Sequence, residues 1–164
     1  MGKTEKEIKE RLYALGADLC GIAGIDRFDG APEGYHPRDV LPSCQSVIVF
    51  ACRFPAGTLA CGSGVPYTVV RNILSDKMDK MAVQFCADME KLHILAVPIR
   101  TNGAERDKKT GRWRSIVSVK HAAQAAGLGT IGRNTLLLTP EYGSMVWLSL
   151  LLTELVLEAD DQKE

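Results

Sequence analysis

The sequence lacks closely spaced cysteines, and this excludes several kinds of site. Its five cysteines stand at positions 20, 44, 52, 61 and 86, and no two of them form a C-x-x-C pair. Structural zinc and iron–sulfur sites draw their thiolates from such pairs, and a disulfide framework uses an even number of cysteines. We therefore expect no metal site within this chain. Five reduced thiols are typical of a cytoplasmic protein.

Long apolar runs and an excess of one charge are also missing. The most apolar stretch, from Met145 to Leu152, is far shorter than the roughly 20 residues of a membrane-spanning helix. The N-terminal residues MGKTEKEIKE are charged and contain no apolar core of a secretory signal. Twenty basic residues balance twenty acidic ones, which argues against nucleic-acid binding through bulk charge. These features predict neither a membrane partner nor a particular oligomeric state.

The length of 164 residues, with 46% hydrophobic residues, suits one globular domain. We place this domain at residues 1–157 and expect residues 158–164 to form a frayed charged tail. Thr4 and Glu7 form a capping-box pattern that opens a helix ending near Leu15. A second helix, about 25 residues long, is predicted by one apolar stripe. The stripe consists of Val70, Leu74, Met78, Met81, Phe85, Met89 and Leu92.

Strands are predicted where short apolar runs are bounded by turn residues. The expected strands cover residues 18–23, 46–52, 94–99, 135–139 and 144–153, and a short alanine-rich helix covers 118–126. Of these, Ser46–Cys52 (SVIVFAC) is the clearest buried strand, because it is continuously apolar and rich in β-branched residues. The order of elements predicts an α+β or α/β domain with helices packed on a mixed sheet.

Two long loops separate these elements, at residues 55–66 and 101–114. The second is the most cationic segment of the chain (TNGAERDKKTGRWR) and contains Trp113, an unusual residue for a loop. Either it is a solvated loop, or it binds an anionic cofactor tail or an acidic redox partner. Both interpretations stay open.

The six residues from Gly127 to Gly132 match the dinucleotide-binding pattern G-x-G-x-x-G. That pattern works where a strand enters the loop and a helix leaves it, whereas here a helix enters and a strand leaves. A Rossmann site is therefore not predicted. Two interpretations remain: a tight helix-to-strand connection, or a loop that lets a ligand approach its backbone N–H groups.

The stretch AAGLGTIGRNTLLLTPEYG, within the segment Val119–Leu155, resembles the epoxyqueuosine reductase-like family of iron–sulfur, cobamide-associated reductases. Softer similarity covers LGADLCGIAG, LPSCQSVIVFA and PYTVVRNIL, in the order found in the family. The resemblance implies an α+β sandwich similar to the nitroreductase and cobalamin-chaperone folds, with helices on a mixed, mainly antiparallel sheet. It also implies cobalamin as the cofactor, with FMN as a less favoured alternative.

By this resemblance the loop lies against the cofactor, and Tyr67 and Tyr142 line the same site. The implied cofactor-binding residues are Gly127, Leu128, Gly129, Thr130, Gly132, Arg133, Asn134, Tyr67 and Tyr142. The implied function is the cofactor-binding module of an iron–sulfur-dependent oxidoreductase whose substrate is not identified. The alternative is a non-catalytic corrinoid carrier or chaperone.

Two departures from the family pattern qualify this implication. Epoxyqueuosine reductases carry a proton-donating aspartate at a position that falls at or near Trp113, yet residues 112–120 (RWRSIVSVK) contain no carboxylate. His121 is the alternative proton donor, because its ordinary pKa of about 6.5 suits acid–base work. The other interpretation is a histidine that caps or packs the start of its helix.

The second departure concerns the electron supply. Relatives continue into cysteine motifs of a ferredoxin-like domain that binds [4Fe–4S] clusters, and this sequence stops at Glu164 without them. We expect residues 158–164 to be the start of such a domain in a longer protein, or the electrons to come from a separate donor.

Overall fold

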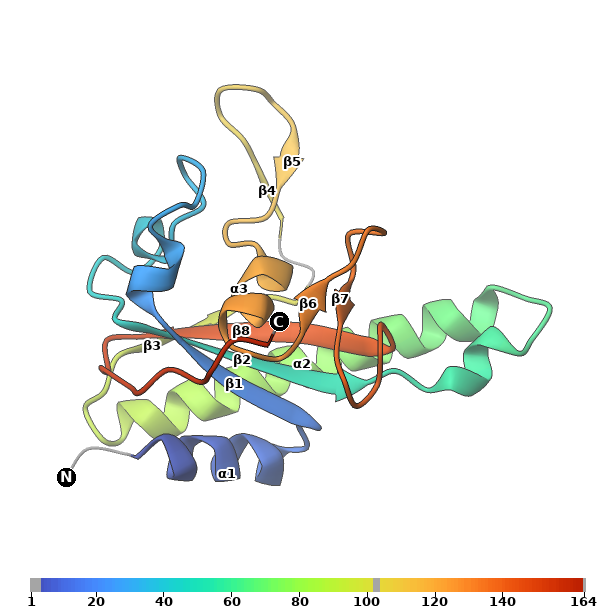
Figure 1. Ribbon diagram of the computed structural model, residues 1–164, viewed down its shortest axis with the longest axis horizontal. Helices are drawn as coiled ribbons and strands as arrows, with labels where there is room; N and C mark the ends of the chain where they lie inside the picture. Colours follow the sequence, from blue (N-terminus) through green and yellow to red (C-terminus); the bar gives the residue numbers. More distant parts are fainter. Residues whose placement is uncertain (1–3, 102–103, 164) are drawn as a thin grey trace.

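The computed structural model describes residues 4–101 and 104–163. Its centre is a four-stranded antiparallel sheet with the strand order β1–β2–β8–β3 (Figure 1). The strands are β1 (Leu19–Gly24), β2 (Ser46–Arg53), β8 (Val146–Thr153) and β3 (Ala96–Ile99). The α+β class is thereby confirmed. All three strand pairs of this sheet are antiparallel, so the expectation of a mixed sheet was wrong, whereas the expectation of a mainly antiparallel one is confirmed.

Strand β2 runs through the middle of the molecule and is buried on both faces. Ile48 and Phe50 belong to the core between the sheet and the two long helices, whereas Val47 and Val49 belong to the core on the opposite face. Successive side chains of a strand point to opposite faces, so a strand covered on both sides needs an unbroken apolar run. This is why SVIVFAC was recognisable from sequence.

Helix α1 (Glu5–Leu15) covers one face of the sheet, as the sequence predicts. The Thr4 hydroxyl accepts a hydrogen bond from the Glu7 backbone N–H, and the Glu7 carboxylate accepts one from the Thr4 backbone N–H. Both halves of the capping box are therefore present. Ile8 and Leu12 are fully buried against the sheet.

Helix α2 (Val65–Glu90) lies beside α1 on the same face. The predicted stripe is buried from Met78 to Met89, but the helix begins before Val70 and ends before Leu92, which is exposed. The first half of α2 extends past the sheet (Figure 1), and its residues are largely exposed. The predicted length of about 25 residues is confirmed by the 26 residues of α2, and the stripe marks the buried half of the helix.

The opposite face of the sheet carries smaller elements. Helix α3 (Val119–Ala125) packs on β2 and β8, and it is followed by the short strands β6 (Thr130–Ile131) and β7 (Leu137–Leu138). A second short hairpin consists of β4 (Glu105–Arg106) and β5 (Trp113–Arg114). Three 3₁₀ turns complete the fold: η1 (Ile25–Phe28), η2 (Pro37–Asp39) and η3 (Ala56–Leu59).

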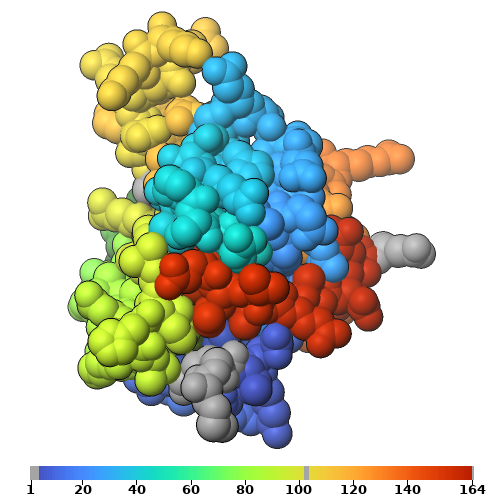
Figure 2. Space-filling view, turned by 90° about the vertical axis from the view of Figure 1, so that its left-hand side faces the viewer, coloured from blue at the N-terminus to red at the C-terminus, as the bar shows by residue number. Residues whose placement is uncertain are grey.

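The C-terminal segment up to residue 163 packs against the domain and is not a frayed tail. The Asp160 backbone N–H donates to the Ile22 carbonyl oxygen, and the Asp160 carboxylate accepts the Ile22 N–H. Lys9 of α1 lies 2.5 Å from the same carboxylate. In Figure 2 this segment (red) lies between the residues around 25–45 (blue to cyan) and α1. The expectation of fraying was wrong because these contacts are long-range and leave no local pattern.

None of the helices in the described part of the chain combines the length and the apolarity that a membrane crossing requires.

Candidate functional site

The glycine-rich loop connects α3 to the β6–β7 hairpin, and its backbone donors are mostly committed to the protein itself. The N–H groups of Gly127 and Leu128 donate to the carbonyl oxygens of Gln124 and Ala123, both at 3.0 Å. The N–H of Gly132 donates to Leu136, and Thr130–Ile131 pairs with β7. Gly127, Leu128 and Gly132 therefore offer no free backbone donor to a cofactor.

Close packing within the chain explains why glycine stands at these positions. A Cβ on Gly127 would lie 2.2 Å from the Asp161 carbonyl oxygen, and one on Gly129 would lie 2.1 Å from the Leu138 carbonyl oxygen. Real Cβ atoms do not approach a backbone oxygen so closely. Of the two interpretations left open by the sequence, the tight connection accounts for both glycines.

The tip of the β6–β7 hairpin, residues 133–138, presents polar and apolar groups together at the surface. Arg133 and Asn134 are exposed, as are Leu136 (46%) and Leu138 (40%). The Asn134 side-chain oxygen accepts the Leu136 N–H, which leaves the amide nitrogen without an acceptor among the described residues. We call residues 133–138 the hairpin tip.

Lys120 fixes the hairpin tip to α3. Its ammonium donates to the carbonyl oxygen of Thr135 at 2.6 Å, and Thr135 has a left-handed backbone with φ of +64°. A depression of about 230 Å³ lies between the tip, the start of α3 and the start of β8. Its lining includes Lys120, Leu136, Leu137 and Trp147. The tip is thus held in place above a small hollow.

The two tyrosines predicted for the cofactor site each contact a residue at or just after the end of β2, Arg53 for Tyr142 and Phe54 for Tyr67. The Arg53 guanidinium lies 5.6 Å from the centre of the Tyr142 ring, and the Phe54 ring lies 4.9 Å from that of Tyr67. Tyr142 belongs to the turn that follows β7, so it is close in sequence to the hairpin tip. Tyr67 lies in the extended first half of α2 and is 39% exposed.

His121 lies elsewhere, at the start of α3. Its Nδ1 is 2.7 Å from the Ser118 hydroxyl oxygen, which fits the interpretation of a histidine that packs the helix start. His121 also lines a pocket of about 600 Å³ together with residues of the 27–35 segment. No residue of the segment 127–134 lines this pocket. The predicted proton donor and the predicted cofactor residues therefore do not form a single pocket, and the catalytic role of His121 stays a prediction.

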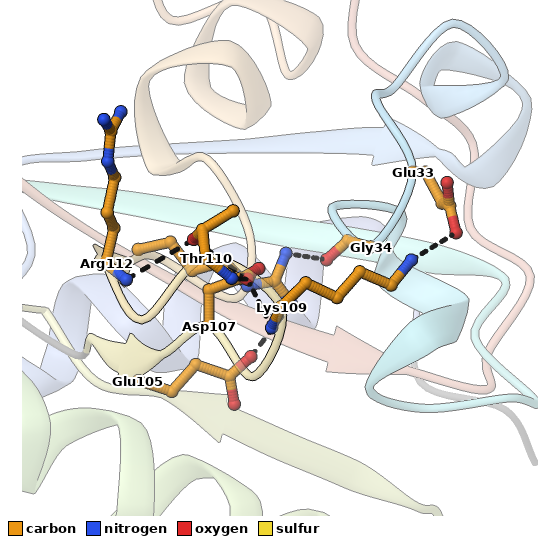
Figure 3. Close-up of polar contacts among 8 residues, drawn as sticks. Glu33, Gly34, Glu105, Asp107, Lys109, Thr110 and Arg112 are labelled. Carbon is orange, nitrogen blue, oxygen red and sulfur yellow. Dashed lines mark hydrogen bonds and ion pairs between the residues drawn. The ribbon is translucent and has the colours of Figure 1, made fainter.

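The cationic loop contains the β4–β5 hairpin (Figure 3), and its residues 102 and 103 lie outside the described residues. Asp107 accepts hydrogen bonds from the N–H groups of Lys109 and Thr110 and from the Thr110 hydroxyl. These bonds, the Thr110 N–H foremost, lower the pKa of Asp107 below its usual value. Arg114 donates to the Gly34 carbonyl oxygen and to the Glu105 carboxylate, so its charge is used in contacts within the protein.

The rest of this hairpin remains exposed. Trp113 is 73% exposed, and the ion pair of Lys109 with Glu33, at 3.4 Å, lies at the surface. Whether the hairpin meets an anionic partner stays a prediction.

The cysteines are dispersed. Cys44 lies in the core on the α3 face, Cys52 in the core beneath α1 and α2, and Cys61 on the exposed segment before α2. Burial raises the pKa of Cys20 to about 12 and that of Cys86 to about 11, which keeps both thiols protonated at neutral pH. Among residues 4–101 and 104–163, no three His, Cys, Asp or Glu side chains are grouped to hold a metal ion.

Sequence reasoning missed the pocket beside His121. Its lining comes from the 27–35 segment, residues 117–118, α3 and Gln162. Arg27 and Gln124 were not singled out, because no motif links residues so far apart along the chain. The one local signal was the proline- and glycine-rich composition of residues 30–37, which marks an irregular segment.

Comparison with known proteins supports one family. No protein-family model matches the chain. The chain is 33% identical to the epoxyqueuosine reductase of Gloeobacter violaceus over 190 aligned residues, which cover 98% of this chain and 55% of that protein. It is 53% identical to the epoxyqueuosine reductase of Listeria monocytogenes over 174 residues, covering 93% of this chain and 39% of the relative.

Solved structures show the same fold. An epoxyqueuosine reductase with an epoxyqueuosine-modified tRNA-Tyr stem loop matches with a TM-score of 0.64 and 21% identity, covering 98% of this chain and 48% of that one. A catabolic reductive dehalogenase in complex with 3-bromo-4-hydroxybenzoic acid matches with a TM-score of 0.71 and 20% identity, covering 97% and 22%. The chain spans about half the length of the curated relatives or less. Over nearly its whole length, this chain belongs to the epoxyqueuosine reductase-like family.

Proposed function

We propose that the chain is the cofactor-binding module of an oxidoreductase of this family and that its cofactor is a corrinoid. The curated relatives are reductases by name, and one structural neighbour is a dehalogenase with B12-dependent chemistry. The proposal places the described chain in one cofactor-binding domain with a nitroreductase-like arrangement. The electrons would come from an iron–sulfur centre of a ferredoxin-like domain or of a separate protein, because the buried thiols here are protonated and dispersed.

The observation that carries the proposal is the mixed chemistry of the hairpin tip. A corrinoid has a broad apolar macrocycle with amide groups at its edge. Leu136 and Leu138 offer exposed apolar contact, and Arg133 and Asn134 offer donors to a side-chain amide or to the nucleotide phosphate. The proposed fit therefore involves the tip and not the backbone N–H groups of Gly127, Leu128 and Gly132, which donate within the protein.

FMN fits the tip less well. Its phosphate carries nearly two negative charges at neutral pH, and Arg133 is the one cation at the tip. When bound, the corrinoid would supply the electron chemistry through its cobalt, and the protein would supply position and surrounding charge. Lys120 would keep the tip in place by its bond to the Thr135 carbonyl oxygen.

Anaerobic titration with cob(II)alamin tests the proposal. We expect a change in the visible spectrum and measurable heat at micromolar protein. The double variant Arg133→Ala/Asn134→Ala should bind at least about tenfold more weakly, because two polar contacts are lost. Lys6→Ala, at an exposed cation of α1 on the opposite face of the sheet, should bind like the parent chain. Absence of both spectral change and heat would overturn the proposal.

A corrinoid carrier is the second candidate. It is favoured by the absence of a carboxylate from residues 112–120, where the family pattern has a proton-donating aspartate. A carrier binds the corrinoid but gives no turnover of an epoxyqueuosine-containing stem loop when a strong chemical reductant is supplied. Turnover under those conditions would exclude the carrier.

A further inference from the structure

The cavity beside His121 has an apolar floor and is large enough for a small organic molecule. Its volume is about 600 Å³, within the range of small-molecule sites. Phe28, Val117 and Ala125 form the floor and are 7%, 1% and 7% exposed. Ala31 and Pro32 add further apolar surface.

One positive charge lines this cavity without a counter-charge. Both N–H groups of Arg27 Nη1 are used, because this atom donates to the carbonyl oxygens of Ala125 and Asp160, each at 2.6 Å. Carbonyl oxygens position the guanidinium but do not neutralise it. The Asp160 carboxylate is itself engaged by Lys9 and by the Ile22 N–H.

Ion pairing distinguishes Arg27 from three other arginines of the chain. Arg11, Arg100 and Arg114 each lie within ion-pair distance of a carboxylate. For Arg27 no carboxylate lies within 4.0 Å in the described ranges 4–101 and 104–163, although the residue is half-buried. Its Nε and Nη2 edge, three N–H donors, has no hydrogen-bond acceptor among those residues. A partly buried guanidinium with a free donor edge is suited to bidentate binding of an oxyanion.

Two neutral polar groups share the cavity with Arg27. The Gln124 side-chain amide makes no hydrogen bond to the described residues, and His121 uses Nδ1 towards Ser118, which leaves Nε2. These groups can orient a polar end of a ligand while the floor takes up an apolar body.

We infer that this cavity binds a small organic carboxylate with an apolar body, such as an aromatic acid, with the carboxylate on Arg27. A single guanidinium balances the single charge of a carboxylate. A phosphate would bring nearly a second negative charge next to an apolar floor, where an unbalanced charge is costly. None of the hairpin-tip residues lines the cavity, so the inference does not depend on the corrinoid proposal.

The probes are benzoate, its neutral analogue benzyl alcohol and inorganic phosphate, each titrated into the ¹⁵N-labelled chain and followed by NMR. Benzoate should cause saturable shifts centred on Phe28, Ala31, Val117 and Ala125, and should bind at least about tenfold more tightly than benzyl alcohol, through the charge-assisted pair. Phosphate should bind more weakly than benzoate. Equal affinity for benzoate and benzyl alcohol, tighter binding of phosphate, or no saturable binding of benzoate would each overturn the inference.

Variants provide the second test. Arg27→Gln should weaken benzoate at least about tenfold and leave benzyl alcohol unchanged, whereas Arg38→Gln, outside the cavity, should change neither. Because Arg27 also supports Ala125 and Asp160, its replacement could unfold the chain. Ala31→Phe makes none of those bonds and fills the cavity, so it should abolish benzoate binding with little change in melting temperature. Unweakened binding of benzoate to Ala31→Phe would overturn the inference.

Discussion

Gly127 lies directly against the backbone of Asp161, so closely that a Cβ on residue 127 would stand 2.2 Å from the Asp161 carbonyl oxygen. The two residues join the loop after α3 to the C-terminal segment. Gly127 also has a φ of +73°, in the left-handed region that ends a helix. Glycine is therefore required at position 127 for two structural reasons, the close approach to Asp161 and the left-handed backbone.

Gly127→Ala should therefore destabilise the chain even when no cofactor is present. The left-handed backbone costs about 1–2 kcal/mol for a non-glycine residue, and displacement of the C-terminal backbone adds about 1–3 kcal/mol. We expect a loss of about 2–5 kcal/mol in the free energy of unfolding, measured by urea denaturation.

Gly57→Ala is the matched control for this prediction. A Cβ at residue 57 meets no atom within 4 Å, and its φ is not in the left-handed region. Its stability should change by less than about 1 kcal/mol. If Gly127→Ala were equally mild in the absence of cofactor, the close approach of residues 127 and 161 would be wrong.

The C-terminal segment should depend on the Asp160 side chain. Asp160→Asn removes the charge that holds Lys9 and weakens the acceptor for the Ile22 N–H. We expect a loss of about 1–2 kcal/mol, because the carboxylate is partly buried and accepts two bonds. Limited proteolysis should cut the segment after Leu157 sooner than in the parent chain.

Asp161→Asn is the control for the segment, since the carboxylate of Asp161 makes no ion pair within the described part of the chain. It should leave both stability and the proteolysis rate unchanged. Faster cleavage in Asp161→Asn alone would contradict the assignment of the contact to Asp160.

Local patterns in the sequence predicted the elements whose stabilising contacts are close along the chain. The capping box of Thr4 and Glu7 needs residues three positions apart, and the unbroken run of β2 reports its own burial on both faces. The hairpins β4–β5 and β6–β7 have ladders of two residues per strand, which is too short for a period-2 pattern to be visible.

The predicted cofactor loop shows which contacts could not be predicted from local sequence patterns. The glycines were recognised, but their partners, Asp161 and Leu138, could not be known without the packing of the C-terminal segment and the hairpin. For the same reason the unpaired charge of Arg27 was invisible. The surroundings of its guanidinium include the carbonyl oxygens of Ala125 and Asp160, which lie about a hundred positions or more away along the chain.

The tie between α1 and α2 should make stability depend on pH. Arg11 donates from Nε and Nη2 to one Asp88 oxygen, at 2.8 and 2.5 Å, and this bond holds the pKa of Asp88 below its usual value. A lowered pKa in the folded state stabilises the fold above the unfolded pKa of about 3.9, and this contribution disappears as the pH falls through the folded value. Arg11→Met should therefore lower the urea midpoint at pH 7 and change it little at pH 2.

Lys6→Met provides the comparison on the same helix. Lys6 lies 3.8 Å from Glu10, and both side chains are well exposed, at 84% and 63%. Such a surface pair contributes little, so the variant should follow the parent chain at both pH values. A pH-independent effect of Arg11→Met would show that Arg11 stabilises the helix pair through packing and not through Asp88.

The thiols should divide into one that reacts quickly and four that react slowly. Cys61 is exposed on the segment before α2, whereas burial raises the pKa of Cys20, Cys44, Cys52 and Cys86. At pH 8 a thiol with a pKa of about 12 is a thiolate in only about one molecule in ten thousand, and the thiolate is the reactive form.

With 5,5′-dithiobis(2-nitrobenzoate) we expect one fast equivalent in the native chain and five after denaturation. Cys61→Ser should remove the fast phase and Cys86→Ser should retain it. Two or more fast equivalents in the native chain would mean that one of these four thiols is open to solvent. The burial of the cysteines could then no longer be used as an argument that the electrons come from outside this chain.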